Sequence, residues 1–129
     1  VVCAAMDARC NQVYVALFRV NGGKVERLTE EECLKTDEAA RMLSEYDDDI
    51  MIVGDGAFIM KKATDAEGME NVKIAPDPLR YQTGYGVCLA AVNAPQLTPE
   101  QLMPMYLKLP QAQRELMAKN AEAYKERKE

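Results

Sequence analysis

The amino-acid sequence predicts an α/β fold built on a mixed, five-stranded β-sheet with helices on both faces. Strand-like runs separated by short turns fill the first third of the chain, which is typical of an antiparallel meander. After them, short apolar runs alternate with segments of helical periodicity, and this alternation indicates crossover units with parallel strands. With 129 residues, 48% of them hydrophobic, the chain is long enough for one domain with its own core.

The meander is predicted from three β-prone runs. Residues 1–6 are apolar, and residues 12–20 are rich in β-branched and aromatic side chains. The Asn-Gly-Gly sequence at 21–23 is expected to form a hairpin turn, because Asn and Gly adopt positive φ at little cost. Residues 24–33 are expected to return as one third strand.

The rest of the chain predicts an alternation of helices and strands. Thr36 is suited to cap a helix with an acidic first turn, and the apolar run at 50–53 is typical of a strand buried on both faces. Pro76 is expected to end a later strand, because proline cannot donate to a sheet. In order, we expect a helix at 36–46, a strand at 50–53, a helix at 57–66, a strand at 71–75, a helix at 79–93, an extended piece at 104–108 and a polar helix at 111–129.

The predicted order of elements is therefore β-β-β-α-β-α-β-α. A meander followed by crossover units is the order of ribonuclease-H-like domains, which also occurs twice in the sugar kinase, Hsp70 and actin group. We expect residues 1–109 to form one such lobe and residues 110–129 to be a polar C-terminal helix or tail. The sequence lacks an initiator Met and opens inside an apolar run, so we expect a piece of a longer protein whose upstream half is absent.

Charge and hydropathy argue against direct nucleic-acid binding and against a membrane-spanning segment. The formal net charge is −5, and an acidic surface repels phosphate, so direct nucleic-acid binding by this domain alone is not expected. A role beside a basic partner that holds RNA stays open. No apolar run approaches the roughly 20 residues of a membrane span, and no signal peptide is recognisable at the start. We therefore expect a cytoplasmic protein without a membrane partner.

Cysteine and histidine usage argues against most metal and nucleophile chemistry. The cysteines Cys3, Cys10, Cys33 and Cys88 include no C-x-x-C pair, and the chain has no histidine. A zinc site would need four scattered thiols to converge, so reduced thiols are the favoured interpretation. Cys3 and Cys88 lie in apolar runs and are expected in the core, with Cys10 at the surface. Without histidine, no Ser–His or Cys–His pair can form.

Two predicted strands are followed by polar residues that could carry chemistry. Asp7 ends the first strand, where a carboxylate can order Mg²⁺, but no glycines adjoin it, so a hydrogen-bonding role is favoured. Arg9 could bind an anion, although pairing with a carboxylate such as Asp7 is favoured. Gly54-Asp55-Gly56 lies between a strand and a helix, where backbone N–H groups can meet phosphate or adenosine. It is shorter than known phosphate-binding loops, which favours a tight β–α turn.

Two further features also have a simpler structural interpretation. Asp47-Asp48-Asp49 is more typical of a solvated loop than of a metal cluster. Tyr81 and Tyr85 lie one turn apart on a predicted helix, where core or groove-rim residues are more common than a stacking platform. We therefore assign no catalytic, cofactor-binding or metal-binding residue from the sequence.

Three stretches together resemble the TsaB family, also known as YeaZ or glycoprotease-like proteins. Residues 6–14, M-D-A-R-C-N-Q-V-Y, are similar to the D-A-R-x-x-x-V-Y pattern that opens the family's second lobe. Residues 53–56, V-G-D-G, follow a buried strand. Residues 104–115, P-M-Y-L-K-L-P-Q-A-Q-R-E, are close to the ending P-x-Y-L-R-x-P-Q-A-E-R-E. The sequence departs mildly from the pattern at positions 10–11, where a small residue is common, and at Lys108, where Arg is common.

The resemblance implies the C-terminal lobe of a two-lobed, actin-like protein that has lost competent ATP chemistry. It implies that the absent N-terminal lobe provides most of the docking surface for the catalytic partner TsaD, and for a homodimer. In the family, TsaB supports TsaD, which acts with the ATPase TsaE to place threonylcarbamoyl on adenosine in tRNA. The implied function is thus a non-catalytic partner subunit without cofactor, with TsaD-like and TsaE-like partners.

Two other function classes remain open. An actin-like ATPase or phosphotransferase, whose missing lobe supplies the phosphate loops, would draw on Asp7 and the turn at 54–56. A peptidase is suggested only by older family labels, and the chain offers it no histidine and no nucleophile–base pair.

Overall fold

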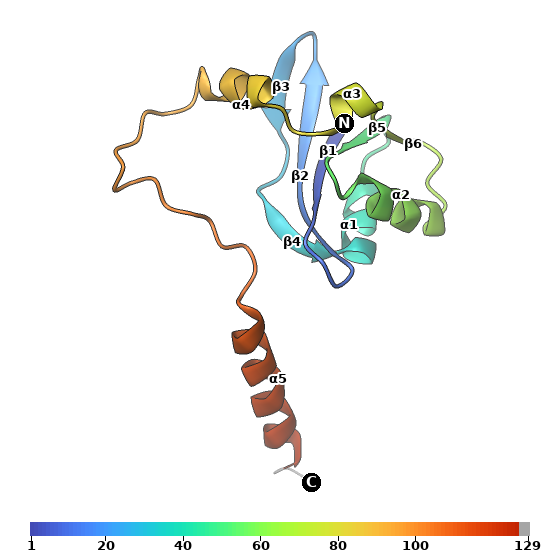
Figure 1. Cartoon of the computed structure of the whole chain (residues 1–129). Coiled ribbons are helices and arrows are strands. Elements are labelled where there is room, and N and C mark those ends of the chain that lie inside the picture. The colour runs from blue at the N-terminus through green and yellow to red at the C-terminus, as the bar shows by residue number, and fades with distance from the viewer. Residues whose placement is uncertain (127–129) are drawn as a thin grey trace.

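The computed structural model describes residues 1–126 (Figure 1). Its strands are β1 (Val2–Asp7), β2 (Gln12–Asn21), β3 (Lys24–Arg27), β4 (Glu32–Lys35), β5 (Ile50–Val53) and β6 (Val72–Ile74). Its helices are α1 (Thr36–Leu43), α2 (Ala57–Ala66), α3 (Asp77–Arg80), α4 (Gly84–Ala91) and α5 (Gln111–Glu126). The predicted C-terminal helix is present up to Glu126, and positions 127–129 lie outside the described residues. None of these helices is both long and apolar enough to cross a membrane.

Strand β1 lies at the centre of a mixed sheet with the order β3-β2-β1-β5-β6. It pairs antiparallel with β2 on one side and parallel with β5 on the other. Strand β6 continues the parallel half beside β5. The sheet is thus the predicted meander joined to parallel crossover strands, and the predicted α/β class is confirmed.

The sheet of the described residues has six strands rather than the predicted five, because residues 24–33 do not form one strand. Strand β3 pairs with the second half of β2, and β4 pairs with its first half. Between them, Leu28 donates its N–H to the Leu17 carbonyl at 2.8 Å, and the Thr29 hydroxyl accepts the Leu17 N–H at 3.0 Å. This bulge bends the chain, so that the ten-residue β2 supports two short partners.

The core lies between one face of the sheet and the helices α1 and α2. Alternation along β2 buries Val13, Val15 and Leu17 on this face. Leu43 of α1 and Met60 of α2 are fully buried against them, and the two helices pack beside each other. Helices α1 and α2 do not cover the opposite face of β1 and β2, which we call the second face.

An extended segment near residue 107 lies over the second face of the sheet. The prediction of helices on both faces is therefore wrong for this face. The predicted helix at 79–93 breaks into α3 and α4, because the backbone is extended at Tyr81 and the Thr83 hydroxyl accepts the Gly86 N–H. This break carries α4 away from the sheet face, and all of its residues are exposed (Figure 1). Cys88 of α4, expected in the core, is therefore at the surface.

The turn after β5 packs directly on the backbone of β1. Gly54 has a φ of +98°, and a Cβ atom added there would overlap the Ala5 carbonyl. At Gly56 the space is tight but not closed, since an added Cβ would lie 3.1 Å from backbone atoms of Ala5 and Met6. Glycine at 54 is therefore required both by the backbone angle and by the lack of space.

We expect Gly54→Ala to lower the free energy of unfolding by about 3 kcal/mol or more, because it adds left-handed strain and a clash with backbone. Gly68→Ala is the matched control. Gly68 also has a positive φ, +74°, but open space around it, so a loss of only about 1–2 kcal/mol is expected. Urea denaturation of the three proteins measures both losses, and equal losses would contradict the close approach to Ala5.

Cys3 on β1 is fully buried, and burial raises the pKa of its thiol from 9.0 to about 12. Because the thiol ionises at lower pH in the unfolded chain, the stability that burial of the protonated thiol contributes is complete below about pH 9 and is lost as pH rises toward about 12.

At about pH 8 we expect alkylation of native protein at the exposed Cys10 and Cys88, and of Cys3 only after denaturation, by peptide mass spectrometry. Native Cys3 reacting as fast as Cys10 would refute this burial. Cys3→Ala should reduce the loss of stability between about pH 9 and 12.

Candidate functional site

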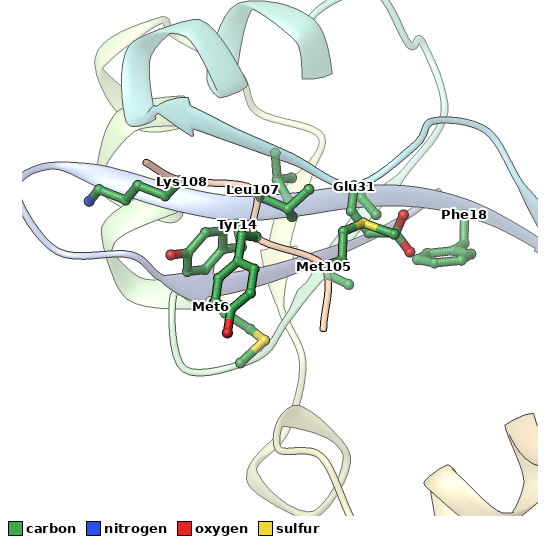
Figure 2. Close-up of a pocket in the computed structure, with 11 residues that line it drawn as sticks. Met6, Tyr14, Phe18, Glu31, Met105, Leu107 and Lys108 are labelled. Carbon is green, nitrogen blue, oxygen red and sulfur yellow. The ribbon is translucent and has the colours of Figure 1, made fainter. Parts of the chain in front are cut away.

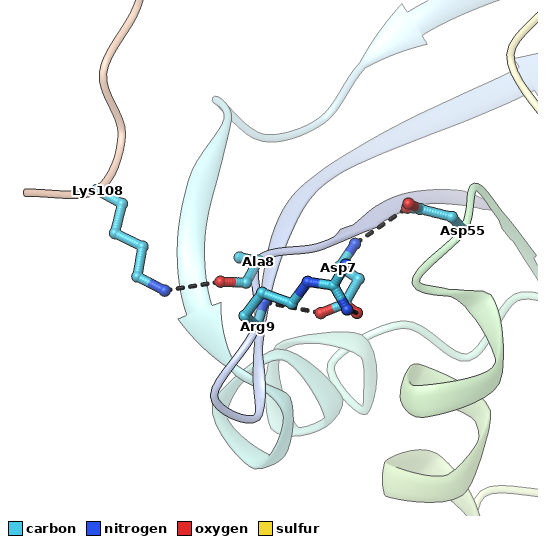
Figure 3. A network of polar contacts seen from close by, with 5 residues as sticks. All are labelled: Asp7, Ala8, Arg9, Asp55 and Lys108. Atoms are coloured by element: carbon cyan, nitrogen blue, oxygen red, sulfur yellow. Dashed lines mark hydrogen bonds and ion pairs between the residues drawn. The ribbon is translucent and has the colours of Figure 1, made fainter. Parts of the chain in front are cut away.

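The candidate site lies at the carboxyl ends of the parallel strands β1 and β5, where open α/β sheets bind their ligands. Strand β1 ends at Asp7 and continues into the loop 8–11, and β5 is followed by the turn 54–56. Figure 3 shows the Asp55 side chain reaching the backbone of Asp7, with Lys108 approaching Ala8 from the C-terminal segment. The two polar positions predicted from the sequence are thus brought together.

Asp7 uses its carboxylate to brace the loop that follows it. Its Oδ1 accepts the Arg9 N–H at 2.7 Å, and its Oδ2 pairs with the Arg9 guanidinium at 3.4 Å. The Asp7 N–H donates to Asp55 Oδ1 at 3.0 Å. These contacts agree with the predicted hydrogen-bonding role of Asp7 and the predicted pairing of Arg9. Because the Arg9 side chain is 86% exposed, the ion pair itself contributes little stability.

The loop 8–11 holds three consecutive non-glycine residues in the left-handed region. Their φ values are +63° at Arg9, +52° at Cys10 and +57° at Asn11. Each such residue costs about 1–2 kcal/mol, so the surrounding contacts must hold the loop. Gln12 closes it by donating its N–H to Arg9 O at 3.0 Å. As a result, Arg9 and Cys10 are presented to solvent on a fixed backbone.

The turn at 54–56 uses its glycine N–H groups within the fold. Gly54 donates to Arg80 O at 2.7 Å, and Gly56 donates to Ala5 O at 3.1 Å. An N–H group that already has a partner is not free to hold a phosphate. The geometry therefore agrees with a tight β–α turn rather than a nucleotide-binding loop.

The other candidates from the sequence stay apart from this site. Asp48 of the acidic run 47–49 pairs with Arg19 at 3.1 Å, and the whole run is exposed, as expected of a solvated loop. Tyr81 and Tyr85 also lie at the surface rather than in the core. Among the side chains that the structure describes, no group of three Cys, Asp or Glu is placed to hold a metal ion.

A segment from near the C-terminus joins the site, and we call Met105–Lys108 the strap. The Lys108 ammonium group donates to Ala8 O at 2.7 Å, although the two residues are 100 positions apart. Leu107 and Lys108 are half-buried, whereas the Tyr106 side chain is 86% exposed. The strap therefore touches the domain mainly through its last two residues.

The strap and the second face of the sheet border an open hollow of about 400 Å³ (Figure 2). Its other lining residues are Ala4, Met6, Tyr14, Val15, Ala16, Phe18 and Glu31. This hollow was not predicted from the sequence. A signal was present, because the alternate residues Tyr14, Ala16 and Phe18 of β2 are apolar or aromatic, as on a strand covered on both faces.

Neither a protein-family model nor a curated protein matches the sequence. Among solved structures, the chain is similar to the crystal structure of "an uncharacterized protein with similarity to peptidase YEAZ from Pseudomonas aeruginosa", with a TM-score of 0.53 and 21% sequence identity. The match covers 83% of this chain and 49% of that one, so this chain spans about half the length of that structure. At this identity the likeness establishes the fold alone, which is YeaZ-like.

We expect Asp7→Ala to lower the free energy of unfolding by about 1–2 kcal/mol, because the left-handed loop loses the acceptor of the Arg9 N–H. Asp7→Asn keeps an oxygen acceptor and should lose less. Arg9→Ala should stay within about 0.5 kcal/mol, since the side chain is exposed. Urea denaturation with and without Mg²⁺ measures these values. Mg²⁺-dependent stabilisation that Asn abolishes as fully as Ala does would indicate a metal ligand instead.

Proposed function

We propose that this chain is the second lobe of a TsaB-type protein and acts as a non-catalytic partner. In this role it supports a TsaD-like subunit that, together with a TsaE-like ATPase, forms N6-threonylcarbamoyladenosine in tRNA. One observation carries the proposal: the three stretches that resemble the TsaB family meet at one edge of a YeaZ-like fold.

The three stretches lie far apart in sequence and are in contact in space. Asp7 of the first is bonded to Asp55 of the second at 3.0 Å. Lys108 of the third is bonded to Ala8 of the first at 2.7 Å. Agreement in order and spacing arises by chance more easily than agreement that also includes contact. These contacts support treating the resemblance as one of structure as well as pattern.

The polar groups of the site support a role through shape and packing. Asp7 braces the loop 8–11, and the glycine N–H groups of the turn 54–56 bond to Ala5 and Arg80. The chain has no histidine that could act as a general base. A partner lobe needs a fixed surface rather than reactive groups, and the loop with the exposed Arg9 supplies one.

The charge of the chain supports a division of labour with its partner. At a net charge of −5 the chain repels the phosphate backbone, so the TsaD-like subunit is the one that holds the tRNA in this proposal. In this proposal a homodimer forms through the N-terminal lobe. A cytoplasmic location follows from the proposed role.

Depletion of the protein in its host is expected to lower the N6-threonylcarbamoyladenosine content of total tRNA, measured by mass spectrometry of nucleosides. Re-expression of the protein with Asp7→Asn should restore the modification, because the proposal requires the loop and no chemistry at Asp7. An unchanged level of the modified nucleoside after depletion would contradict the proposal.

The alternative is an actin-like ATPase or phosphotransferase, with Asp7 and the turn 54–56 as its local support. Calorimetry with Mg-ATP separates the two functions. Micromolar binding that Asp7→Ala removes would favour the enzyme, whereas the partner lobe is expected to give no binding heat.

A further inference from the structure

We propose that the hollow binds an extended peptide of a partner protein, and that the strap occupies this place in the resting chain. The peptide is of a defined class: an extended segment in which an apolar residue is followed by Lys or Arg. This inference rests on the contacts of the strap and goes beyond the proposed role in tRNA modification.

The seated strap indicates what the hollow accepts. Residues 93–110 contain no helix or strand, and the strap crosses the sheet face as an extended chain (Figure 2). Leu107 lines the hollow and is half-buried, and the next residue, Lys108, places its ammonium group 2.7 Å from Ala8 O. An apolar side chain in the hollow and a cation on this carbonyl are thus the two recognition elements. A carbonyl oxygen in the left-handed loop keeps a fixed direction and favours a cation at that end.

The strap borders the hollow and is held there by few contacts. Among the described residues, the bond from Lys108 to Ala8 is the one hydrogen bond that joins residues 95–117 to residues 1–94. The Met105 and Tyr106 side chains are 71% and 86% exposed and so contribute little burial. A segment held by so few contacts detaches from the sheet face at a small cost in free energy. Residues 93–104 keep it attached to the domain, so that it can bind there again.

Space and apolar surface remain with the strap in place. The hollow still measures about 400 Å³, and Met6 on its floor is 54% exposed. Tyr14 lies opposite Met6 in the sheet, and Phe18 and Met105 line the same hollow, a surface that adapts to different apolar groups (Figure 2). The carboxylate of Glu31 is already paired with Arg27 at 2.8 Å, so the cation of the peptide is directed to the Ala8 end.

The test uses the whole chain and a fluorescein-labelled peptide with the sequence of residues 104–110, Pro-Met-Tyr-Leu-Lys-Leu-Pro. The double variant Leu107→Ser, Lys108→Ser removes both contacts of the strap and frees the hollow. Leu102→Ser is the matched control, because Leu102 is exposed in the same segment and does not line the hollow. By fluorescence anisotropy, the double variant should bind the peptide at least about tenfold tighter than the wild type and the control, since a closed strap reduces the apparent affinity.

Met6→Lys, added to the double variant, should weaken peptide binding, because it places a like charge in the hollow at a half-exposed position that folding tolerates. Two-dimensional NMR of the wild type gives a second measurement that needs no variant: excess peptide should move the amide signals of residues 105–108 toward the positions of an unstructured chain.

Several results would overturn the proposal. They are equal peptide affinity in the double variant and the control, equal binding of a peptide with Ser and Glu in place of Leu and Lys, and unchanged NMR signals of residues 105–108 in excess peptide. A concentration-dependent wild-type dimer that the double variant loses, seen by light scattering, would instead make a second copy the occupant.

Discussion

The close approach of the Gly54–Gly56 turn to Ala5 of β1 is the constraint on which the site depends. Strand β1 is bonded to β2 on one side and to β5 on the other, so its backbone has no freedom to move aside. Only a residue without Cβ fits at position 54, and this brings Asp55 within 3.0 Å of the Asp7 N–H. The end of β1, the start of the loop 8–11 and the start of α2 are therefore fixed relative to one another.

The two faces of the sheet differ in how they are covered. One face forms the hydrophobic core that stabilises the domain, and the other is the face proposed to bind a peptide. Helices α1 and α2 seal one face with fully buried side chains such as Leu43 and Met60. Among the described residues, the other face has apolar side chains with the four-residue strap across it. Residues 81–99, which include α4, contain no charged side chain, although all of α4 is exposed. A helix that is apolar on all sides is normally buried, so α4 is a further surface where contacts with other molecules are expected.

The sequence was sufficient for those parts of the fold that depend on local patterns. Alternation in residues 12–20 and helical spacing at 57–66 are read over a few residues, and both elements form as predicted. The break at Thr83 was missed, because a single side-chain bond to the Gly86 N–H outweighs the dense apolar pattern of 79–93. The division of residues 24–33 likewise depends on the Thr29 hydroxyl, which replaces a backbone acceptor. No periodic pattern in the sequence predicts either of these two hydrogen bonds.

In the candidate site, too, the positions of residues were predictable from the sequence and single hydrogen bonds were not. The positions of Asp7 and the turn 54–56 were predictable, because parallel neighbours end at one edge of a sheet. Their bonding partners were not, and neither was the contact between Lys108 and Ala8, which spans 100 residues and has no local signature. The resemblance to a family pointed to the same residues without stating that they touch.

That contact also couples the loop to the strap. Ala8 O accepts the Lys108 ammonium group at the start of a loop whose next three residues are held in the left-handed region. A partner that grips Arg9 or Cys10 and shifts this carbonyl changes the stability of the seated strap. By thermodynamic reciprocity, a peptide that displaces the strap changes the affinity of the loop for that partner by the same factor. In the proposed binding mode the loop and the strap share one hydrogen bond, so we expect the occupancy of one surface to influence the other.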